Sequence, residues 1–402
     1  MMNTSKPAVV VITGASTGIG RATVRAFAKR GVHIGLLARS RDGLEGARQE
    51  VENAGAKALV LPTDVSNPEP VEAAAVAVEK EFSPIDIWVN NAMASISSPF
   101  LEIKPEEFRH VTEVTYLGHV YGTMAALRRM KKRDHSTIVQ VGSALAYRSI
   151  PLQSAYCGAK AAIRGFTDSI RCELNHDSSN VYVTMVQMPA VNTPQFDWIK
   201  SNMPHKSQPV PPIFQPEVAA EAIVWGATHK RRELYVGSST VEAILGTKVT
   251  PGLLDRYLDQ TGYKSQQTDQ PENQNRLSNL WESLPDDHGA HGRFDDQVQD
   301  YSTQLWATEN QDWLILGLGT GVVLVALGAY LGQSQPQPYV HQKDEDDRIT
   351  ELDINTKVAR QLHQNVNRSS KLDKWNLLTG LARFTWKAFT AEPQNNQKAT
   401  QS

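Results

Sequence analysis

Residues 9–28 read VVVITGASTGIGRATVRAFA, and this stretch decides the fold. A run of β-branched residues leads into a turn with glycines at positions 14, 18 and 20, and an alanine-rich helical pattern follows. Glycines let the chain turn sharply and approach a phosphate closely, while the free N–H groups at the start of a helix attract an anion. Because this GxxxGxG spacing lies between a strand and a helix, it predicts a dinucleotide-binding turn; a purely structural turn is the alternative.

Short apolar runs continue to alternate with longer helical stretches from Ala8 to about Val236. This alternation is typical of a parallel sheet covered by helices on both faces, so we expect a doubly wound, Rossmann-type α/β domain over residues 1–240. Helices are expected at Gly20–Arg30 and Ser154–Leu174. The seven expected strands are Ala8–Thr13, His33–Ala38, Lys57–Pro62, Ile85–Asn90, Thr137–Val141, Val181–Met188 and Glu233–Val236.

The second expected strand ends in GLLARSR, residues 35–41. A domain that prefers NAD usually carries an acidic residue here to hold the ribose 2′-hydroxyl, but this chain has Arg39 directly after Ala38. A guanidinium suits the 2′-phosphate of NADP, so the sequence favours NADP over NAD, with a lone surface arginine as the alternative. The loops at Asp64–Val65 and Asn90–Ala92 follow two further strands and are expected to line the cofactor crevice.

A candidate catalytic group spans the fifth strand and the helix after it. Ser143 ends the strand, and Tyr156 and Lys160 lie four residues apart on one face of the helix. A tyrosine has an ordinary pKa of about 10, so it moves protons near neutral pH only where a cation stabilises its phenolate. Lys160 can supply that charge, and Ser143 can donate a hydrogen bond to a substrate oxygen. The group predicts proton exchange with a carbonyl or hydroxyl while a hydride passes to or from nicotinamide.

In this order, the TGASTGIG turn, the NNA segment and the S…YxxxK pattern resemble the short, single-domain branch of the short-chain dehydrogenase/reductase family over residues 8–240. The resemblance implies an oxidoreductase acting on alcohol or carbonyl groups, with Ser143, Tyr156 and Lys160 as catalytic residues. It also implies a possible homo-oligomer, because family members commonly form dimers or tetramers. It assigns cofactor binding to Gly14, Ser16, Thr17, Gly18, Ile19, Gly20, Arg39, Asp64, Val65, Asn90, Tyr156, Lys160, Pro189 and Thr193.

Three positions depart from the common pattern of the family. The usual NNAG reads NNAM, with Met93 in place of glycine, and Thr115 stands where a fourth catalytic asparagine is often found. The segment that meets the nicotinamide amide keeps Pro189 and Thr193 but has lost its glycine. These departures leave a second hypothesis, a catalytically impaired NADP(H)-binding sensor or scaffold at a membrane. A sugar-nucleotide epimerase is disfavoured by the glycine spacing and by the lack of a substantial second α/β lobe.

The connection Val191–Pro216 is long and proline-rich, and it carries Phe196, Trp198, Met203 and Phe214. Long loops in this position often cover a binding site, so we expect a substrate lid and an apolar or lipid-like substrate. The alternative is that these side chains only pack the loop onto the core.

Residues 241–312 are expected to form an extension or linker, because residues 262–312 are rich in Gln, Asn, Asp and Gly with scattered aromatic residues. Trp281 and its neighbours suit a strap docked on the main domain, and a mobile linker is the other interpretation. His288 and His291 have no partner ligands nearby in the sequence, so no metal site is expected.

Residues 313–331, WLILGLGTGVVLVALGAYL, are an uncharged run whose helical length nearly matches a hydrocarbon core of about 30 Å. We expect a transmembrane helix in contact with membrane lipid, and a buried core helix is the alternative. The polar tail, residues 332–402, shows the spacing of a basic amphipathic helix near its end, suited to a membrane surface or to packing on protein. Its many Lys and Arg residues favour a cytoplasmic tail, which a re-entrant helix would allow.

Composition limits the partners and the compartment. The formal net charge is -2, from 41 Lys and Arg against 43 Asp and Glu, so there is no basic excess of the kind that nucleic-acid binding requires. Cys157 and Cys172 show no metal or disulfide spacing, and the N-terminus lacks a secretory signal pattern. We therefore expect a catalytic domain in the cytoplasm that is associated with a membrane.

Overall fold

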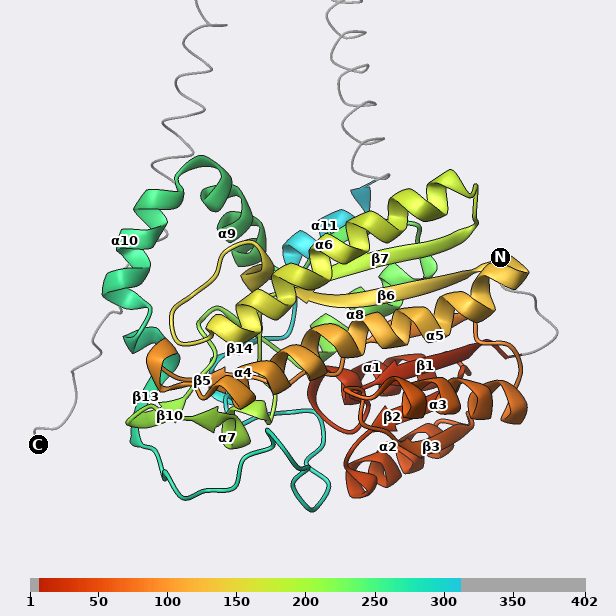
Figure 1. Cartoon of the computed structure of the whole chain (residues 1–402), viewed down its shortest axis with the longest axis horizontal. Helices are drawn as coiled ribbons and strands as arrows, with labels where there is room; N and C mark the ends of the chain where they lie inside the picture. The colour runs from red at the N-terminus through yellow and green to blue at the C-terminus, as the bar shows by residue number, and fades with distance from the viewer. Residues whose placement is uncertain (1–6, 312–402) are drawn as a thin grey trace, which may run out of the picture. The chain divides into compact units, whose positions relative to one another are not determined.

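The computed structural model describes residues 7–311, which contain one large parallel sheet with helices on both faces (Figure 1). Seven strands follow the order β12-β7-β6-β4-β1-β2-β3, and every neighbouring pair is parallel. The winding reverses between β1 and β4, where open sheets of this kind bind their ligands. The strands are β1 (Val9–Thr13), β2 (His33–Ala38), β3 (Ala58–Pro62), β4 (Ile87–Asn90), β6 (Ser136–Ser143), β7 (Val181–Met188) and β12 (Glu233–Tyr235). The predicted doubly wound, Rossmann-type sheet is confirmed.

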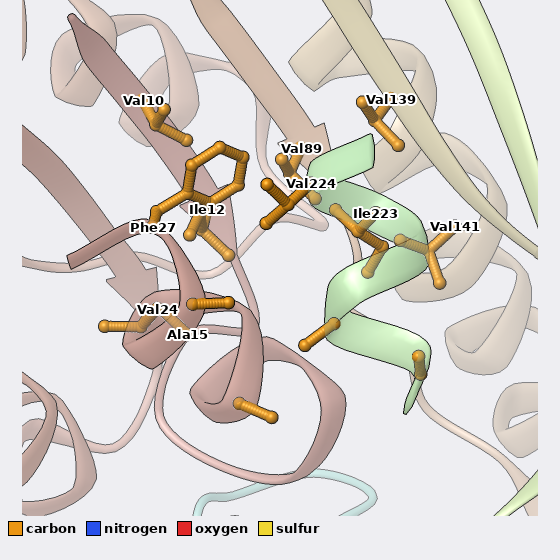
Figure 2. Packing of buried hydrophobic residues seen from close by; sticks show 14 of the residues in the cluster. Val10, Ile12, Ala15, Val24, Phe27, Val89, Val139, Val141, Ile223 and Val224 are labelled. Carbon is orange, nitrogen blue, oxygen red and sulfur yellow. The ribbon is translucent and has the colours of Figure 1, made fainter. Parts of the chain in front are cut away.

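Alternation along the buried strands builds two apolar layers. In β1, Val10 and Ile12 face one side of the sheet and pack in a cluster with Phe27 and Ile223 (Figure 2). Val9 and Val11 face the other side and join a second cluster. Because successive side chains of a strand point to opposite faces, a strand buried on both sides reads as a continuous apolar run, as VVVIT does.

The helices divide between the two faces of the sheet. Helix α1 packs against α2 and α8 on one face, while α3 packs against α5, and α4 against α6, on the other. Helix α1 begins two residues before the predicted Gly20, and α6 extends two residues beyond the predicted Leu174. The helices are α1 (Gly18–Ala28), α2 (Arg41–Asn53), α3 (Pro68–Glu81), α4 (Pro105–Thr112), α5 (Gly118–Arg133), α6 (Ser154–His176), α7 (Gln195–Trp198) and α8 (Pro216–Thr228).

The chain after β12 packs back onto the sheet domain, in agreement with the docked strap that the sequence allowed. Two helices, α9 (Ser238–Val249) and α10 (Pro251–Thr261), come first. Strand β13 (Gln267–Pro271) then pairs antiparallel with β10 (His205–Ser207). Strand β14 (Val298–Gln299) lies parallel to β11 (Ile213–Phe214), which in turn pairs with β8 (Ala190–Val191). A pair of two-residue strands and a last helix complete the described chain: β5 (Ile96–Ser97), β9 (Lys200–Ser201) and α11 (Thr303–Glu309).

The predicted transmembrane run, residues 313–331, and the polar tail, residues 332–402, lie outside the described residues. Among the helices of residues 7–311, none combines the length and the apolar composition needed to cross a bilayer.

Candidate active site

The glycine turn between β1 and α1 forms the floor of a cleft at the carboxyl ends of the strands. Gly14 has a φ of +67°, which favours glycine, and a Cβ on Gly20 would overlap the carbonyl oxygen of Gly14. Thr17 is the N-cap residue of α1, yet its side chain accepts no capping hydrogen bond. The turn is therefore tight, and the positive end of an 11-residue helix is left without a side-chain cap, which fits the pyrophosphate of a dinucleotide.

The cleft above this turn encloses about 1090 Å³, its open mouth included. Nine of the predicted cofactor residues line it: Gly14, Ser16, Thr17, Gly18, Ile19, Arg39, Asp64, Val65 and Thr193. Gly20, Asn90, Pro189, Tyr156 and Lys160 do not belong to its lining. The cleft therefore gathers the residues from the first three strand ends, together with Thr193 from the loop after β7.

Arg39 follows the last residue of β2 and lies at the far end of this cleft. Its Nη2 donates to the carbonyl oxygen of Asn279 at 2.5 Å, and its Nη1 donates to those of Leu280 and Trp281 at 3.3 and 2.8 Å. Burial lowers the pKa of Arg39, and the charge of Asp64 opposes that shift. Arg39 is thus a half-buried cation whose hydrogen bonds within residues 7–311 all go to neutral carbonyl oxygens.

The three candidate catalytic residues meet where β6 ends and α6 begins. Ser143 is the last residue of β6, and its Oγ accepts from the backbone N–H of Leu145 at 3.1 Å. Tyr156 and Lys160 lie one helical turn apart on α6. The Nζ of Lys160 lies 5.6 Å from the centre of the Tyr156 ring and donates to the carbonyl oxygen of Val141 at 2.7 Å. This bond to the sheet fixes the ammonium beneath the tyrosine.

Burial dominates the electrostatics of this group. It lowers the pKa of Lys160 from 10.5 to about 7. It also raises the pKa of Tyr156 above its ordinary value, and the hydrogen bond with Ser143 opposes that shift. In the cofactor-free protein, Tyr156 therefore keeps its proton near neutral pH, and Lys160 can exchange one there.

The departures from the family pattern have local structural consequences. Met93 lines the cleft, where a glycine would leave more room. Thr115 is fully buried, and its Oγ1 both donates to the carbonyl oxygen of Ala94 at 2.8 Å and accepts from its N–H at 2.9 Å. Asn90 is also fully buried and donates from Nδ2 to Thr123 and Gln140, so its side chain supports the sheet.

The loop Val191–Pro216 uses most of its apolar side chains for packing. Phe196 packs edge-on against Phe294 in a small buried cluster, and Phe214 belongs to the main core. Met203 is 4% exposed, and Trp198, which is also buried, lines the cleft. Phe196 and Phe214 are therefore buried among protein side chains, which is the packing that the alternative interpretation of this loop predicts.

The main element that the sequence did not place is the belt, which we define as residues 272–297, between β13 and β14. Asn279, Ser283, Leu284, Asp286 and His288 of the belt line the cleft together with the glycine turn. Its sequence signals were the aromatic residues Trp281 and Phe294 in a polar stretch, which suited a docked strap or a mobile linker. The belt forms no α-helix or long strand, and its position follows from contacts with residues distant in the sequence, among them Arg39 and His110.

The two belt histidines make protein contacts. The ring of His288 lies edge-on to that of Trp198, and His291 hydrogen-bonds the carboxylate of Glu217 at 3.0 Å. Within residues 7–311, no group of three or more His, Cys, Asp or Glu side chains is arranged to hold a metal ion.

Comparison with known proteins agrees with the geometry of the cleft. A family model described as short chain dehydrogenase matches residues 8–203. The uncharacterized oxidoreductase YxnA of Bacillus subtilis is 33% identical over 282 residues, which are 69% of this chain and 79% of the relative. The 3-dehydrosphinganine reductase of Danio rerio is 32% identical over 223 residues, which are 54% of this chain and 67% of the relative.

A solved structure is also similar. It is an alcohol dehydrogenase from the archaeon Thermococcus sibiricus complexed with 5-hydroxy-NADP, with a TM-score of 0.51 and 30% identity, covering 57% of this chain and 96% of that one. The chain therefore belongs to the short-chain dehydrogenase family and is an oxidoreductase that acts on alcohol or ketone groups with a nicotinamide cofactor.

Proposed function

We propose that this protein is an NADP(H)-dependent oxidoreductase in which Ser143, Tyr156 and Lys160 are the catalytic residues. The observation that carries the proposal is the position of Lys160, which is 2% exposed, bonded to the sheet and 5.6 Å from the centre of the Tyr156 ring. A buried cation beside a tyrosine, next to the carboxyl end of β6, is the arrangement that proton transfer needs.

The bound nicotinamide would supply or accept the hydride. Tyr156 donates its phenolic proton to the carbonyl oxygen during reduction and takes the hydroxyl proton during oxidation. Lys160 stabilises the phenolate that forms, and its pKa of about 7 suits proton exchange near neutral pH. Ser143 donates a hydrogen bond to the same substrate oxygen and keeps it in reach of Tyr156.

The preference for NADP is supported by Arg39. The position after β2 holds a cation and no carboxylate, and this cation lacks a hydrogen-bonded acid within the described chain. A guanidinium binds a phosphate through two parallel hydrogen bonds, whereas the ribose hydroxyl of NAD offers it no charge. The similar archaeal structure contains a derivative of NADP, in keeping with this preference.

We propose further that the substrate is apolar or lipid-like and that the protein works at a membrane. A similar protein from Danio rerio is named a 3-dehydrosphinganine reductase, which denotes a lipid substrate. The hairpin of α9 and α10 exposes Leu245, Val249 and Leu253, at 51%, 74% and 63%. Clustered exposed apolar groups of this kind suit an apolar surface. The proposed organisation is a catalytic domain over residues 1–240, an extension over 241–312, a membrane helix over 313–331 and a polar tail over 332–402.

Substitution of Tyr156 tests the proposal. Tyr156→Phe removes only the hydroxyl, so we expect turnover to fall by about a hundredfold or more while NADPH affinity stays within about twofold. The readout is NADPH consumption by the full-length chain with long-chain ketones and aldehydes, together with NADPH binding by fluorescence. Tyr182→Phe is the matched control, because Tyr182 lies at the amino end of β7, far along the strand from Met188 and the cleft.

Residual turnover above about a tenth of the parent rate in Tyr156→Phe would contradict the catalytic role. If the parent chain binds NADPH but consumes none with any carbonyl or alcohol, the sensor or scaffold hypothesis, which Met93 and Thr115 motivate, gains instead.

A further inference from the structure

The belt closes the end of the cleft that holds Arg39. Five of its residues line the cleft together with Arg39, Asp64 and the glycine turn, so it forms a wall of the cavity and does not fill it. Leu280 is fully buried in the apolar cluster on one face of the sheet. The belt is therefore packed onto the domain through Leu280 and forms part of the wall of the cleft.

The hydrogen bonds of Arg39 leave part of its guanidinium free. The side chain has five N–H donors, and Asn279, Leu280 and Trp281 accept from Nη1 and Nη2 only. Three acceptors occupy at most three donors, so within residues 7–311 the Nε–H and one Nη2–H have no acceptor. In a guanidinium, the Nε–H and one Nη2–H form an edge that matches the spacing of two phosphate oxygens, and this edge is open when Asn279 accepts the other Nη2–H. The belt can thus hold Arg39 while Arg39 binds an anion.

Other contacts hold the three carbonyl groups in place. His110 donates from Nε2 to the carbonyl oxygen of Leu280 at 2.8 Å, and its ring stacks on that of Trp281 with the centroids 4.4 Å apart. The N–H of Asn279 donates to the carbonyl oxygen of Trp198 at 3.1 Å. The belt segment that faces Arg39 is therefore fixed to α4 and to the loop after β7.

A second arginine anchors the belt beside the glycine turn. Arg21 is 1% exposed and pairs with Glu50 at 2.8 Å and with Asp287 of the belt at 2.9 Å. Its Nη1 also donates to the carbonyl oxygen of Ser16 in the turn at 3.1 Å. The carbonyl oxygen of Gly289 accepts from the N–H of Gly18 at 3.1 Å. Asp287 thus ties the belt to the same turn that forms the floor of the cleft.

We propose that the belt is a specificity-determining part of the cofactor site: the carbonyl groups of Asn279–Trp281 orient Arg39 so that its Nε edge receives the 2′-phosphate of NADP(H). The proposal rests on the proposed NADP(H) preference. Asp287 and Trp281 are positioning residues, because they act on the cofactor through Arg39. A freely rotating arginine would lose side-chain entropy on binding the phosphate, and the belt removes that loss in advance.

Asp287→Ala in the full-length chain tests the proposal. Removing this carboxylate frees the belt from Arg21, so we expect the Kd for NADPH to rise about tenfold while the Kd for NADH changes less than about twofold. Asp296→Ala is the matched control, since Asp296 is an exposed belt carboxylate. Both constants are measured by cofactor fluorescence, and Trp281→Ala, which removes the stack on His110, should show the same selectivity loss.

An Arg39→Ala background separates this inference from the proposed function. If the belt acts through Arg39, Asp287→Ala in that background should change NADPH affinity by less than about twofold. Equal weakening of NADPH and NADH by Asp287→Ala and Trp281→Ala would overturn the inference, as would unchanged affinity for both. If Arg39→Ala itself leaves the NADPH to NADH ratio unchanged, the proposed cofactor preference fails, and the inference fails with it. Should Asp287→Ala not fold, Trp281→Ala alone decides, because Trp281 is 51% exposed.

Discussion

Replacing Lys160 with methionine should stabilise the cofactor-free protein, and most strongly at low pH. Burial lowers the pKa of Lys160 from 10.5 to about 7. Folding therefore disfavours the charged form of this lysine. Below pH 7 the lysine is charged in both the folded and the unfolded chain, so the folded protein bears the full cost of burying the ammonium. A methionine of similar length removes that cost and, under the proposed mechanism, also removes catalysis.

The magnitude follows from the difference between the two pKa values. One pKa unit corresponds to about 1.4 kcal/mol, so the change from 10.5 to about 7 corresponds to a cost of about 5 kcal/mol below pH 7. Lys160→Met also leaves the buried carbonyl group of Val141 without its 2.7 Å hydrogen bond, at a cost of about 1–3 kcal/mol. We therefore expect the variant to gain about 2–4 kcal/mol in the free energy of unfolding near pH 6.5. Above pH 7 the native lysine becomes neutral, so the gain should shrink by about 3 kcal/mol by pH 9.

Urea unfolding followed by tryptophan fluorescence, at both pH values and without cofactor, measures this change. Lys29→Met is the control, because Lys29 is exposed at the end of α1. A variant that is more stable by the same amount at both pH values would refute the electrostatic explanation. A Lys160→Met protein less stable than the parent near pH 6.5 would show that the ammonium is compensated in the native state, contrary to its burial.

Two further substitutions test the cofactor cleft. Arg39→Asp should lower the ratio of kcat/KM for NADPH over NADH by about one to two orders of magnitude, because it removes charge-assisted hydrogen bonds and adds repulsion. Arg109→Asp, at an exposed position, is the control and should not change this ratio. If the two variants show the same ratio, Arg39 does not belong to the cofactor site. Gly20→Ala should weaken NADPH and NADH alike and lower Tm, because the new Cβ would overlap the carbonyl oxygen of Gly14. Gly158→Ala is the control, because the new Cβ would meet nothing within 4 Å, and it should stabilise α6 slightly. If Gly20→Ala binds both cofactors with the affinity of the parent protein, the turn is not as tight as the structure indicates.

The sheet could be predicted because its signals are local. His33–Ala38 was predicted as a strand with the bounds that the structure has, since an apolar run of that length between turn residues leaves few other choices. The glycine turn, Asp64 and Arg39 followed from the same logic, because parallel strands end at one edge of a sheet and their next residues converge there.

The belt and the loop after β7 could not be predicted in the same way. Leu280 is fully buried, and the segment around it is held by His110 and Arg39, which are 170 and 241 positions away. Phe196 was one of the apolar residues from which the sequence predicted an apolar substrate. In the structure it packs against Phe294, and no sequence pattern indicates that contact. Such contacts join residues far apart in the sequence, so local propensity and spacing do not reveal them.

Three cations at the active site are compensated in different ways, and the difference indicates what the cleft binds. Arg21 has two carboxylates, Glu50 and Asp287, and its pKa is raised. Lys160 and Arg39 hydrogen-bond only backbone carbonyl groups within residues 7–311, and burial lowers the pKa of both. A buried cation without a bonded acid is costly unless a ligand brings the negative charge. We therefore infer that Arg21 holds the structure together, whereas Arg39 suits a phosphate of the cofactor and Lys160 suits the phenolate of Tyr156.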